Sequence, residues 1–468
     1  MEDVVILGAG PAGLAAGFEL SKNGESVALI DKNGEVGGLS RTSQVKGCRF
    51  DLGPHVFIKR NERIVDFWKL IGKGRLSEIQ ENSKQYYQGK VYGSFGDIFL
   101  KLPLSERLAV VADFLKRRLF PISNAVSCEQ QMINDYGEKM YSIFQKAYTQ
   151  KFWGLDLSQI DRNMYNNMIK KISFDALAKK TSLKWLQEKG LIKKPHEAPQ
   201  GHRFFHHALG SGQMYANLAE MTQKTRNAEF HMNSRVVRVN HDGKKITSIE
   251  TEDTHGKTRK HEGSQFISTI PLNVFLESLR PAPPKEILEA ANKLYFRNLV
   301  MVHLVVEGNP FDAQWMQVMS DDITAYRITN FSNLSNHMGS GSLCPVGIEY
   351  NCFENDAIWK MSDEEIIDFA KREMEKAGLV EKKRVVDASV LKVDYVYPIY
   401  FLGYEKFVSA VADYLSKFEN LQCISRSSIY RYNNMGHAVE SGLVAADNLL
   451  GARQDVKKLN ALDGKQDI

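Results

Sequence analysis

The fold of this chain is decided near its start by the stretch Val4-Val5-Ile6-Leu7-Gly8-Ala9-Gly10-Pro11-Ala12-Gly13. Its four leading apolar residues predict a short buried strand, and the apolar spacing that follows predicts a helix over residues 11–22. Residues 27–30 predict a second strand, so residues 4–31 are expected to form a β-α-β unit. The G-x-G-x-x-G pattern lies between a strand and a helix, which is the placement that a dinucleotide-binding turn requires.

In this pattern each glycine has its own physical role. Gly8 permits the tight turn, Gly10 lets the backbone approach a pyrophosphate, and Gly13 lets the helix pack closely on the strand. The pyrophosphate is expected at the helix N-terminus, where unpaired N–H groups and the helix dipole point. Asp31 ends the second strand 18 residues after Gly13 and is predicted to accept hydrogen bonds from ribose hydroxyls. The alternative is an incidental glycine-rich turn.

A second glycine pair follows six residues after Asp31, in the string Gly37-Gly38-Leu39-Ser40-Arg41-Thr42. A glycine pair with an arginine suits another close pass over phosphate, because a guanidinium matches phosphate oxygens as a fork. A simple nicotinamide dehydrogenase has no need of this string, so it favours FAD over NAD as the cofactor. The alternative is a flexible turn with a surface arginine.

Length and composition narrow the class of protein further. With 468 residues, two or three intertwined domains are expected. The formal net charge of +5 is spread without a long basic run, so a nucleic acid partner is not expected. The five cysteines include no C-x-x-C pair, which argues against a disulfide framework or a metal site and favours a reducing compartment. With no room for a targeting peptide and no apolar run of about 18 residues, we predict a cytoplasmic protein without a transmembrane segment.

The pattern of elements along the chain predicts an α/β fold (α+β overall), with a Rossmann-type FAD-binding domain, a mixed-sheet substrate domain and a helical insert. The FAD-binding domain is expected to come from three segments, residues 1–100, 201–275 and 405–455. The remaining segments are a helical insert at 101–200, a substrate-binding domain at 276–404 and a flexible tail at 456–468. Helices are predicted at 62–72, 102–119, 127–148, 174–189, 363–377, 405–418 and 437–450, and an antiparallel meander within 229–270.

The helix predicted near residues 102–118 is amphipathic. One face carries Leu104, Leu108, Val111 and Leu115, and the end carries Lys116, Arg117 and Arg118. We expect this apolar face to pack into the core, with attachment to a membrane surface as the alternative.

Taken together, these strings resemble the superfamily of flavoprotein amine oxidases, protoporphyrinogen oxidase and phytoene desaturase. Two further strings are similar to UDP-galactopyranose mutases: Gly53-Pro54-His55-Val56-Phe57 and Tyr148-Thr149-Gln150-Lys151-Phe152-Trp153-Gly154. The C-terminal string from Tyr430 to His437 resembles the cofactor-closing motif of both groups. Overall, the chain looks like bacterial members of the superfamily that are associated with polysaccharide or sugar-nucleotide pathways.

The resemblance runs from residue 4 to about 451 and implies FAD as the cofactor. Val237 would pair its backbone with the adenine edge, and Thr269 would lie where the family strand returns to the cofactor. Asn434 and Met435 would lie against the flavin ring and ribityl chain. The full implied set of cofactor contacts is Gly8, Gly10, Ala12, Gly13, Asp31, Gly38, Leu39, Arg41, Val237, Thr269, Asn434 and Met435. The chain departs from the family at Ser425, where the family commonly has Gly, and at Gly436, where it has Asp.

Candidate catalytic residues follow from the same resemblance. His55 lies where mutase-like sequences place a histidine near the flavin, and it is suited to position substrate or move a proton. Arg426 matches the arginine that meets a substrate diphosphate in mutases, with a salt bridge to the sheet edge as the alternative. Tyr397, Tyr400 and Tyr432 match aromatic positions of the family pocket, and core packing is the alternative for each. Trp153 is a candidate wall of the pocket, with a place in the core of the helical domain as the alternative. His206 and His207 are expected at the surface.

Three functions are compatible with these residues. The first is an FAD-dependent oxidoreductase that transfers hydride from a small-molecule substrate to flavin N5, with polysaccharide or sugar-nucleotide metabolism as a candidate context. The second is a non-redox sugar-nucleotide mutase, and the third is an inactive flavin-binding protein. The expected partners are a small-molecule substrate, with a sugar nucleotide as one candidate, and a second copy of the chain in a candidate homodimer.

Overall fold

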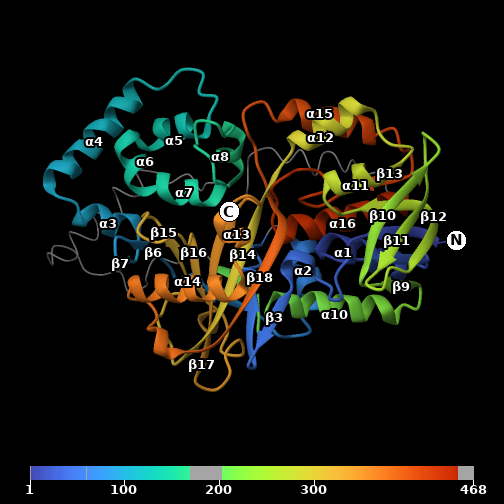
Figure 1. Ribbon diagram of the computed structural model, residues 1–468, viewed down its shortest axis with the longest axis horizontal. Coiled ribbons are helices and arrows are strands. Elements are labelled where there is room, and N and C mark those ends of the chain that lie inside the picture. Colours follow the sequence, from blue (N-terminus) through green and yellow to red (C-terminus); the bar gives the residue numbers. More distant parts are fainter. Residues whose placement is uncertain (1, 60, 169–202, 452–468) are drawn as a thin grey trace.

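The structure is a computed structural model that describes residues 2–59, 61–168 and 203–451. Figure 1 shows two sheets side by side, each with its own helices, and a separate group of helices at one end of the molecule. This arrangement confirms a mixed α/β fold with a parallel nucleotide-type sheet and a mixed second sheet. The helix predicted at 174–189 and the tail predicted at 456–468 lie outside the described residues.

The first sheet has a parallel centre, which matches the prediction from residues 4–31. Its strands run in the order β13-β10-β11-β12-β1-β2-β9, and β19 also pairs with β12. Val4 pairs with Val27 and Leu7 with Ile30, and both strands are buried along most of their length because helices cover the two faces. The parallel strands are β1 (Glu2–Leu7), β2 (Val27–Ile30), β9 (Ala228–His231), the second half of β12 (Thr258–Ser268) and β19 (Leu421–Cys423).

The predicted meander is confirmed on the edge of this sheet. Strand β10 pairs antiparallel with β11, and β11 pairs with the first half of β12. The strands at this edge are β10 (Ser234–His241), β11 (Ile246–Asp253) and the short β13 (Leu279–Arg280). Three helices lie near the same end of the sheet: α11 (Leu272–Ser278), α12 (Lys285–Lys293) and α15 (Glu405–Leu415).

Helix packing around the first sheet depends on small residues. A Cβ on Gly442 would lie 2.2 Å from the carbonyl oxygen of Ala12, so α16 crosses the start of α1 in close contact. Asn61 caps the helix that follows it by accepting a hydrogen bond from the N–H of Ile64. The four helices are α1 (Pro11–Lys22), α2 (Glu62–Ile71), α10 (Ser211–Lys224) and α16 (Met435–Leu449).

The second sheet has the order β18-β14-β17-β16-β15-β6-β7. Its longest buried strand is β14, whose residues are all buried except the last, because β17 and β18 flank it and α14 lies over the sheet. The strands are β6 (Ser83–Tyr87), β7 (Lys90–Tyr92), β14 (Phe296–Glu307), β15 (Trp315–Val318), β16 (Arg327–Asn330), β17 (Leu343–Cys352) and β18 (Val385–Pro398), with α13 (Ala357–Lys360) and α14 (Asp363–Lys376).

Residues 83–92 belong to this second sheet, although they fall within the segment 1–100 that was assigned to the FAD-binding domain. Strand β6 pairs in parallel with β15, from Ser83 opposite Trp315 to Tyr86 opposite Val318. The pairing buries Tyr86, which is 1% exposed, and this packing holds the strand in the second sheet. Two smaller ribbons join the sheets: β3 (Thr42–Val45) with β4 (Cys48–Asp51), and β5 (Leu76–Gln80) with β8 (Arg203–His207).

The helical group corrects one sequence prediction. The single helix expected over 127–148 is wrong, because Gly137 has φ +79° and ends one helix and starts another, and Gln145 separates the next pair. A Cβ on Gly137 would lie 3.1 Å from the backbone nitrogen of Phe114, so close packing on α4 requires the break. The group contains α3 (Phe95–Lys101), α4 (Leu104–Leu119), α5 (Cys128–Tyr136), α6 (Glu138–Phe144), α7 (Lys146–Trp153) and α8 (Arg162–Met168).

Helix α4 also differs from the prediction. The expected core packing of its leucine face is wrong, because Leu104, Leu108 and Leu115 are exposed, and Val110 and Phe114 face the other helices instead. Within the described ranges, no helix has the length and apolar character that crossing a bilayer would need.

Candidate functional site

The glycine turn between β1 and α1 has the shape that a pyrophosphate needs. Gly8 has φ +103°, and a Cβ there would lie 2.1 Å from Thr269 Oγ1, while a Cβ on Gly13 would lie 1.9 Å from the carbonyl oxygen of Gly8. These two glycines are therefore required by the packing of the chain on itself. Around Gly10, by contrast, the nearest atom to a Cβ is the Cα of Gly38, at 3.8 Å. Gly10 thus leaves bare backbone facing open space.

The first turn of α1 faces this space. Gly10 is the N-cap and makes no side-chain cap bond, so the N–H groups of the first turn, including that of Ala12, remain for a ligand. Gly38, with φ +53°, brings the second glycine string against the first, since its own Cβ would lie 3.1 Å from the Cα of Gly10. Arg41 follows, and its Nη1 donates a long hydrogen bond, 3.4 Å, to the carbonyl oxygen of Gly38.

Asp31 stabilises the glycine turn by accepting a hydrogen bond from its backbone. Its Oδ2 accepts a hydrogen bond from the N–H of Ala9 at 2.8 Å, and its Oδ1 accepts from the N–H and the Nδ2 of Asn33 at 2.8 and 2.9 Å. A carboxylate has about four acceptor sites, so a ribose hydroxyl can still be accommodated. The predicted ribose contact stays a prediction, and the turn-bracing role of Asp31 was not expected from the sequence.

Two more predicted contacts lie near the end of β2 and the end of β12. The register of β10 shifts between Val236 and Arg238, which leaves the backbone of Val237 outside the ladder at a β-bulge, as pairing with a ligand edge would require. Thr269 donates to the carbonyl oxygen of Leu7 from both its N–H and its Oγ1, at 2.8 Å each. Thr269 therefore fixes the backbone at the end of β1, next to Gly8.

The N-terminus of α16 lies beyond that of α1. Asn434 is its N-cap and accepts from the N–H of His437 at 3.3 Å, and Met435 begins the helix. The close contact with Ala12 is made by Gly442, seven residues along α16, which puts the helix start roughly 10 Å further on at 1.5 Å per residue. The positive end of this helix dipole is directed toward the region between the two sheets.

From Gly38 the chain leads directly to a second cluster. After the β3–β4 ribbon, Gly53 has φ +105°, and a Cβ there would lie 2.9 Å from Arg327 Nη2 and 3.1 Å from Glu349 Oε2. His55 follows two residues later, and its half-buried ring has an enclosed Nδ1 without a hydrogen-bond partner in the described structure. The string Gly53-Pro54-His55 therefore connects the glycine turns with the second sheet.

Arg327 and Glu349 form the charged centre of this cluster. They face each other across β16 and β17, and Arg327 donates to both carboxylate oxygens of Glu349, from Nε and Nη2 at 2.6 Å each. Tyr326 donates its hydroxyl to Glu349 Oε2 at 2.8 Å. Glu349 is fully buried, so the pair is a bidentate, charge-assisted contact in a site with little water.

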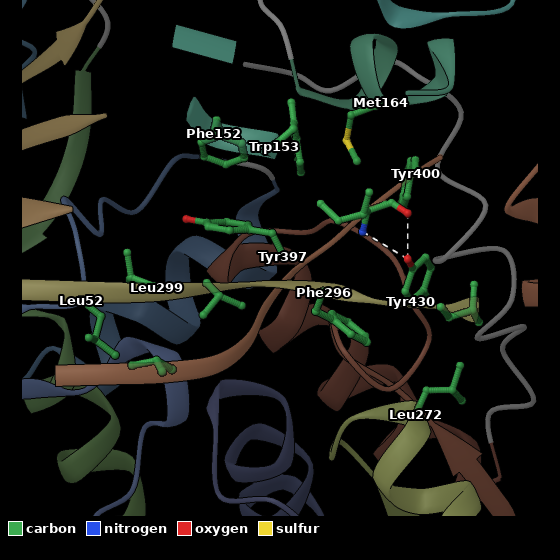
Figure 2. Packing of buried hydrophobic residues seen from close by; sticks show 14 of the residues in the cluster. Leu52, Phe152, Trp153, Met164, Leu272, Phe296, Leu299, Tyr397, Tyr400 and Tyr430 are labelled. Atoms are coloured by element: carbon green, nitrogen blue, oxygen red, sulfur yellow. Dashed lines mark hydrogen bonds between the residues drawn. The ribbon is translucent and has the colours of Figure 1, made fainter. Parts of the chain in front are cut away.

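Aromatic rings surround this ion pair. Tyr397 and Tyr432 stack with centroids 6.0 Å apart, and the guanidinium of Arg426 lies 5.2 and 5.0 Å from their ring centres. The ring centroid of Phe152 lies 4.7 Å from that of Tyr397. Figure 2 shows Tyr397 next to Phe152 and Trp153, with its hydroxyl directed away from Tyr430.

Arg426 is held by the backbone rather than by a carboxylate. Its Nε and Nη2 donate to the carbonyl oxygen of Asn433, and its Nη1 donates to that of Val396 at 3.0 Å. These bonds tie the loop before α16 to β18. Backbone carbonyl contacts thus stand where the alternative for Arg426 had a salt bridge at the sheet edge, and part of the donor capacity of the guanidinium remains for a ligand. The predicted contact with a substrate diphosphate stays a prediction.

Two of the predicted aromatic residues, Tyr400 and Trp153, are buried behind the rings that could line a ligand site. Tyr400 is 2% exposed, stacks on Tyr404 at 4.4 Å and accepts a hydrogen bond from the N–H of Tyr432 at 2.9 Å. Trp153 is also 2% exposed and packs against Phe152. Their geometry supports Tyr432 and Tyr397 from behind, and the catalytic role predicted for Tyr400 remains untested.

The prediction that His206 and His207 lie at the surface is wrong. They are 2% and 1% exposed, because β8 pairs antiparallel with β5 and contacts α10. His206 Nε2 lies 3.6 Å from the buried Asp51, which also accepts from the N–H of Ser211 and from Thr42 Oγ1. Asp51 therefore anchors the N-terminus of α10.

The sequence reasoning did not single out the ion pair at the centre of the cluster, nor the ring of Tyr326 beside it, and it named Tyr148 only within the mutase-like string. Burial raises the pKa of Tyr148 to about 12, against the field of Arg327, so its phenol is neutral. One signal was present, because Glu349 interrupts the apolar run of β17. A buried carboxylate in an apolar strand needs a partner, and only the strand register identifies Arg327.

The pKa of His55 gives a testable pH dependence. Burial, opposed by Asp51 and reinforced by the guanidiniums of Arg327 and Arg426, lowers this pKa from 6.5 to about 4. The unfolded chain takes up a proton near pH 6.5 and the folded chain does not, so His55 reduces stability as the pH falls from 6.5 toward 4. In a histidine-labelled NMR titration, the His55 ring, identified by its absence in His55→Gln, is expected to titrate near pH 4. A midpoint at 6 or above would contradict this.

The residues present fit the phosphates of a dinucleotide, since Gly10 leaves bare backbone at the open first turn of α1 and the second glycine string, which carries Arg41, packs against it. The chain is 31% identical to a 4,4'-diapophytoene desaturase of Methylomonas sp. over 32% of its own length and 25% of the desaturase. It spans from a quarter to about half the length of the curated relatives it matches first.

Two solved structures share the fold over nearly the whole chain. A reduced UDP-galactopyranose mutase superposes with a TM-score of 0.82 at 20% identity, covering 98% of this chain and 97% of the mutase. A protein described as a protoporphyrinogen oxidase from Exiguobacterium sp. 255-15 superposes with a TM-score of 0.70 at 15% identity, covering 96% and 98%. The model of one family matches residues 11–450. The chain therefore belongs to the family of flavin-containing amine oxidoreductases.

Proposed function

We propose that this protein binds FAD and oxidises an anionic, hydroxyl-bearing small molecule of the sugar-nucleotide class. The observation that carries the proposal is the cluster of tyrosines and two guanidiniums around the neutral His55, directly after the glycine turns. FAD bound along those turns supplies the acceptor for a hydride at its N5 atom. Gly10, Ala12, Asp31, Gly38 and Arg41 would hold its adenosine and phosphate half.

The remaining proposed cofactor contacts are distributed along the path toward the second sheet. Leu39 lies in the second glycine string and packs against the core, and Val237 would offer free backbone at its bulge to the adenine. Asn434 and Met435 start the helix whose positive end would stabilise negative charge on a reduced flavin. Gly8, Gly13 and Thr269 act indirectly, by shaping the turn.

The charges of the cluster favour an anionic substrate. Arg327 and Arg426 bring two positive charges. Glu349 pairs with Arg327, and Asp51, whose charge also acts on His55, is bound by Thr42 and Ser211. A protonated amine would be repelled there, whereas the phosphates of a nucleotide would be attracted. The rings of Tyr397 and Tyr432 offer faces on which a base or a sugar can stack.

His55 is suited to take up the hydroxyl proton of the substrate. Its low pKa keeps the ring neutral at physiological pH, so one nitrogen can accept a proton. The Nδ1 atom is enclosed, which leaves Nε2 as the nitrogen that a ligand can reach. The buried Phe152 and Trp153 help to exclude water from the tyrosine side of the site.

A mutase that uses the flavin without net oxidation is the second candidate. The similarity of fold to a reduced UDP-galactopyranose mutase favours it, as does the tyrosine-rich cluster. An inactive flavin-binding protein is the third, and it would leave the neutral His55 without a role.

Anaerobic titration of the oxidised holoenzyme with UDP-sugars separates these candidates. We expect the visible flavin absorbance to bleach with one equivalent of the correct sugar nucleotide, and the bleaching to slow by about 100-fold or more in His55→Gln. The control His337→Gln, an exposed histidine in the loop after β16, should bleach at the wild-type rate. Turnover only after reduction, without net electron transfer, would show a mutase, and bleaching by amines alone would contradict the substrate class.

A further inference from the structure

Helix α4 carries an apolar stripe that is exposed to solvent. Leu104, Leu108, Leu115 and Leu119 are 62%, 62%, 54% and 73% exposed, and Phe120 after the helix is 69% exposed. The spacing of four, seven and four residues puts these leucines on one face of the helix. Figure 1 shows α4 at the outer rim of the helical group, with α5 and α6 on its inner side. We call Leu104, Leu108, Leu115 and Leu119 the leucine stripe.

The charges of α4 are sorted around the leucine stripe. At about 100° per residue, Lys116 lies on one side of Leu115 and Arg118 lies about 60° away on the other, so basic residues flank the stripe. Both are exposed. Acidic residues are kept away, because Glu106 and Asp113 lie about 160° from Leu108 and Leu115, respectively.

Two further charged residues of α4 face inward. Asp113 accepts a hydrogen bond from the N–H of Lys139 at 2.9 Å, and Arg117 lies 3.8 Å from Glu138, so both are turned toward α6. Val110 and Phe114 bury the apolar side that packs on the other helices. Two different apolar faces therefore exist on one helix, and only one of them is covered by the described chain.

We propose that the leucine stripe of α4 docks the protein onto the surface of an anionic lipid bilayer, with the helix lying in the plane of the interface. A helix of 16 residues is about 24 Å long, so the four leucines can enter the acyl boundary together. Lys116 and Arg118 would then meet lipid phosphates on both sides of the stripe, as snorkelling basic residues do. The charge pattern selects anionic lipid over a neutral apolar partner, which would not need basic residues on both flanks.

Vesicle co-sedimentation of the full-length holoenzyme tests the proposal. We expect binding to vesicles of phosphatidylglycerol and phosphatidylcholine, with a partition coefficient at least about tenfold above that for pure phosphatidylcholine. High salt should weaken this binding, because the basic flanks contribute to it. No difference between the two vesicle types would overturn the proposal.

Matched variants separate the two components of the surface. Leu108→Gln/Leu115→Gln and Lys116→Glu/Arg118→Glu should each lower binding to anionic vesicles by about tenfold or more, while Leu70→Gln, an exposed leucine of α2, should not. Flavin content and melting temperature should stay unchanged, because these side chains are already exposed. A lower melting temperature in the leucine variant would show that this chain covers the stripe, and loss of a dimer would show a self-interface. Either result would overturn the proposal.

Discussion

The Gly10→Ala variant is expected to fold normally and to lose FAD. A Cβ at this position meets nothing of the protein closer than 3.8 Å, and the backbone there, with φ −79°, is open to any residue. The new methyl group would project into the space above the first turn of α1, where the pyrophosphate must touch bare backbone. We expect FAD affinity to fall at least about 100-fold, or about 2.8 kcal/mol, as measured by titrating FAD into the apoprotein.

The control for this experiment is Gly13→Ala. A Cβ there would lie 1.9 Å from the carbonyl oxygen of Gly8, so the strand–helix contact itself must open. This variant is expected to lower the melting temperature of the apoprotein, whereas Gly10→Ala should leave it unchanged. If Gly10→Ala binds FAD within threefold of wild type, the pyrophosphate does not lie where we place it.

Removal of the Glu349 carboxylate is expected to have the largest effect on stability. In Glu349→Ala, Arg327 loses both of its carboxylate bonds, and Tyr326 loses its acceptor, at a position that is fully buried. Breaking a buried ion pair from one side typically costs about 3–5 kcal/mol. Urea unfolding monitored by circular dichroism should show a loss of this size in the free energy of unfolding.

The double variant Arg327→Met/Glu349→Leu separates the contribution of the ion pair to stability from its contribution to substrate binding. Replacing both charges with apolar groups of similar size leaves no unpaired charge, so stability should return close to that of wild type. Binding of the anionic substrate should nevertheless be lost, because the guanidinium is gone. A stable double variant that binds sugar nucleotides as the wild type does would show that Arg327 has no part in recognition.

Local sequence signals were sufficient wherever the physical cause was itself local. The glycine string, the strand before it and the helix after it are adjacent in the chain, and the structure confirms all three. The same holds for the meander, whose turn residues lie next to the strands that they join. The helix predicted over 127–148 was wrong, because the break at Gly137 is imposed by contact with α4.

Burial of individual side chains was the least predictable property. His206 and His207 follow a polar stretch and were expected at the surface, yet the pairing of β8 with β5 buries both. Leu104, Leu108 and Leu115 were expected in the core and are exposed. In both cases the pattern of polar and apolar residues along the chain does not tell which face of an element another element covers.

By itself, the sequence determined the nucleotide-binding unit, because a glycine acts through its own backbone and its immediate neighbours, and these are written in order along the chain. Only the tertiary structure decided the cluster around Arg327 and Glu349. Its members come from β16, β17, β18, α7 and the loop before α16, and strand register and helix packing alone bring them together. The chemistry proposed here depends on that distant pairing, since a buried carboxylate and a guanidinium are stable only when each faces the other.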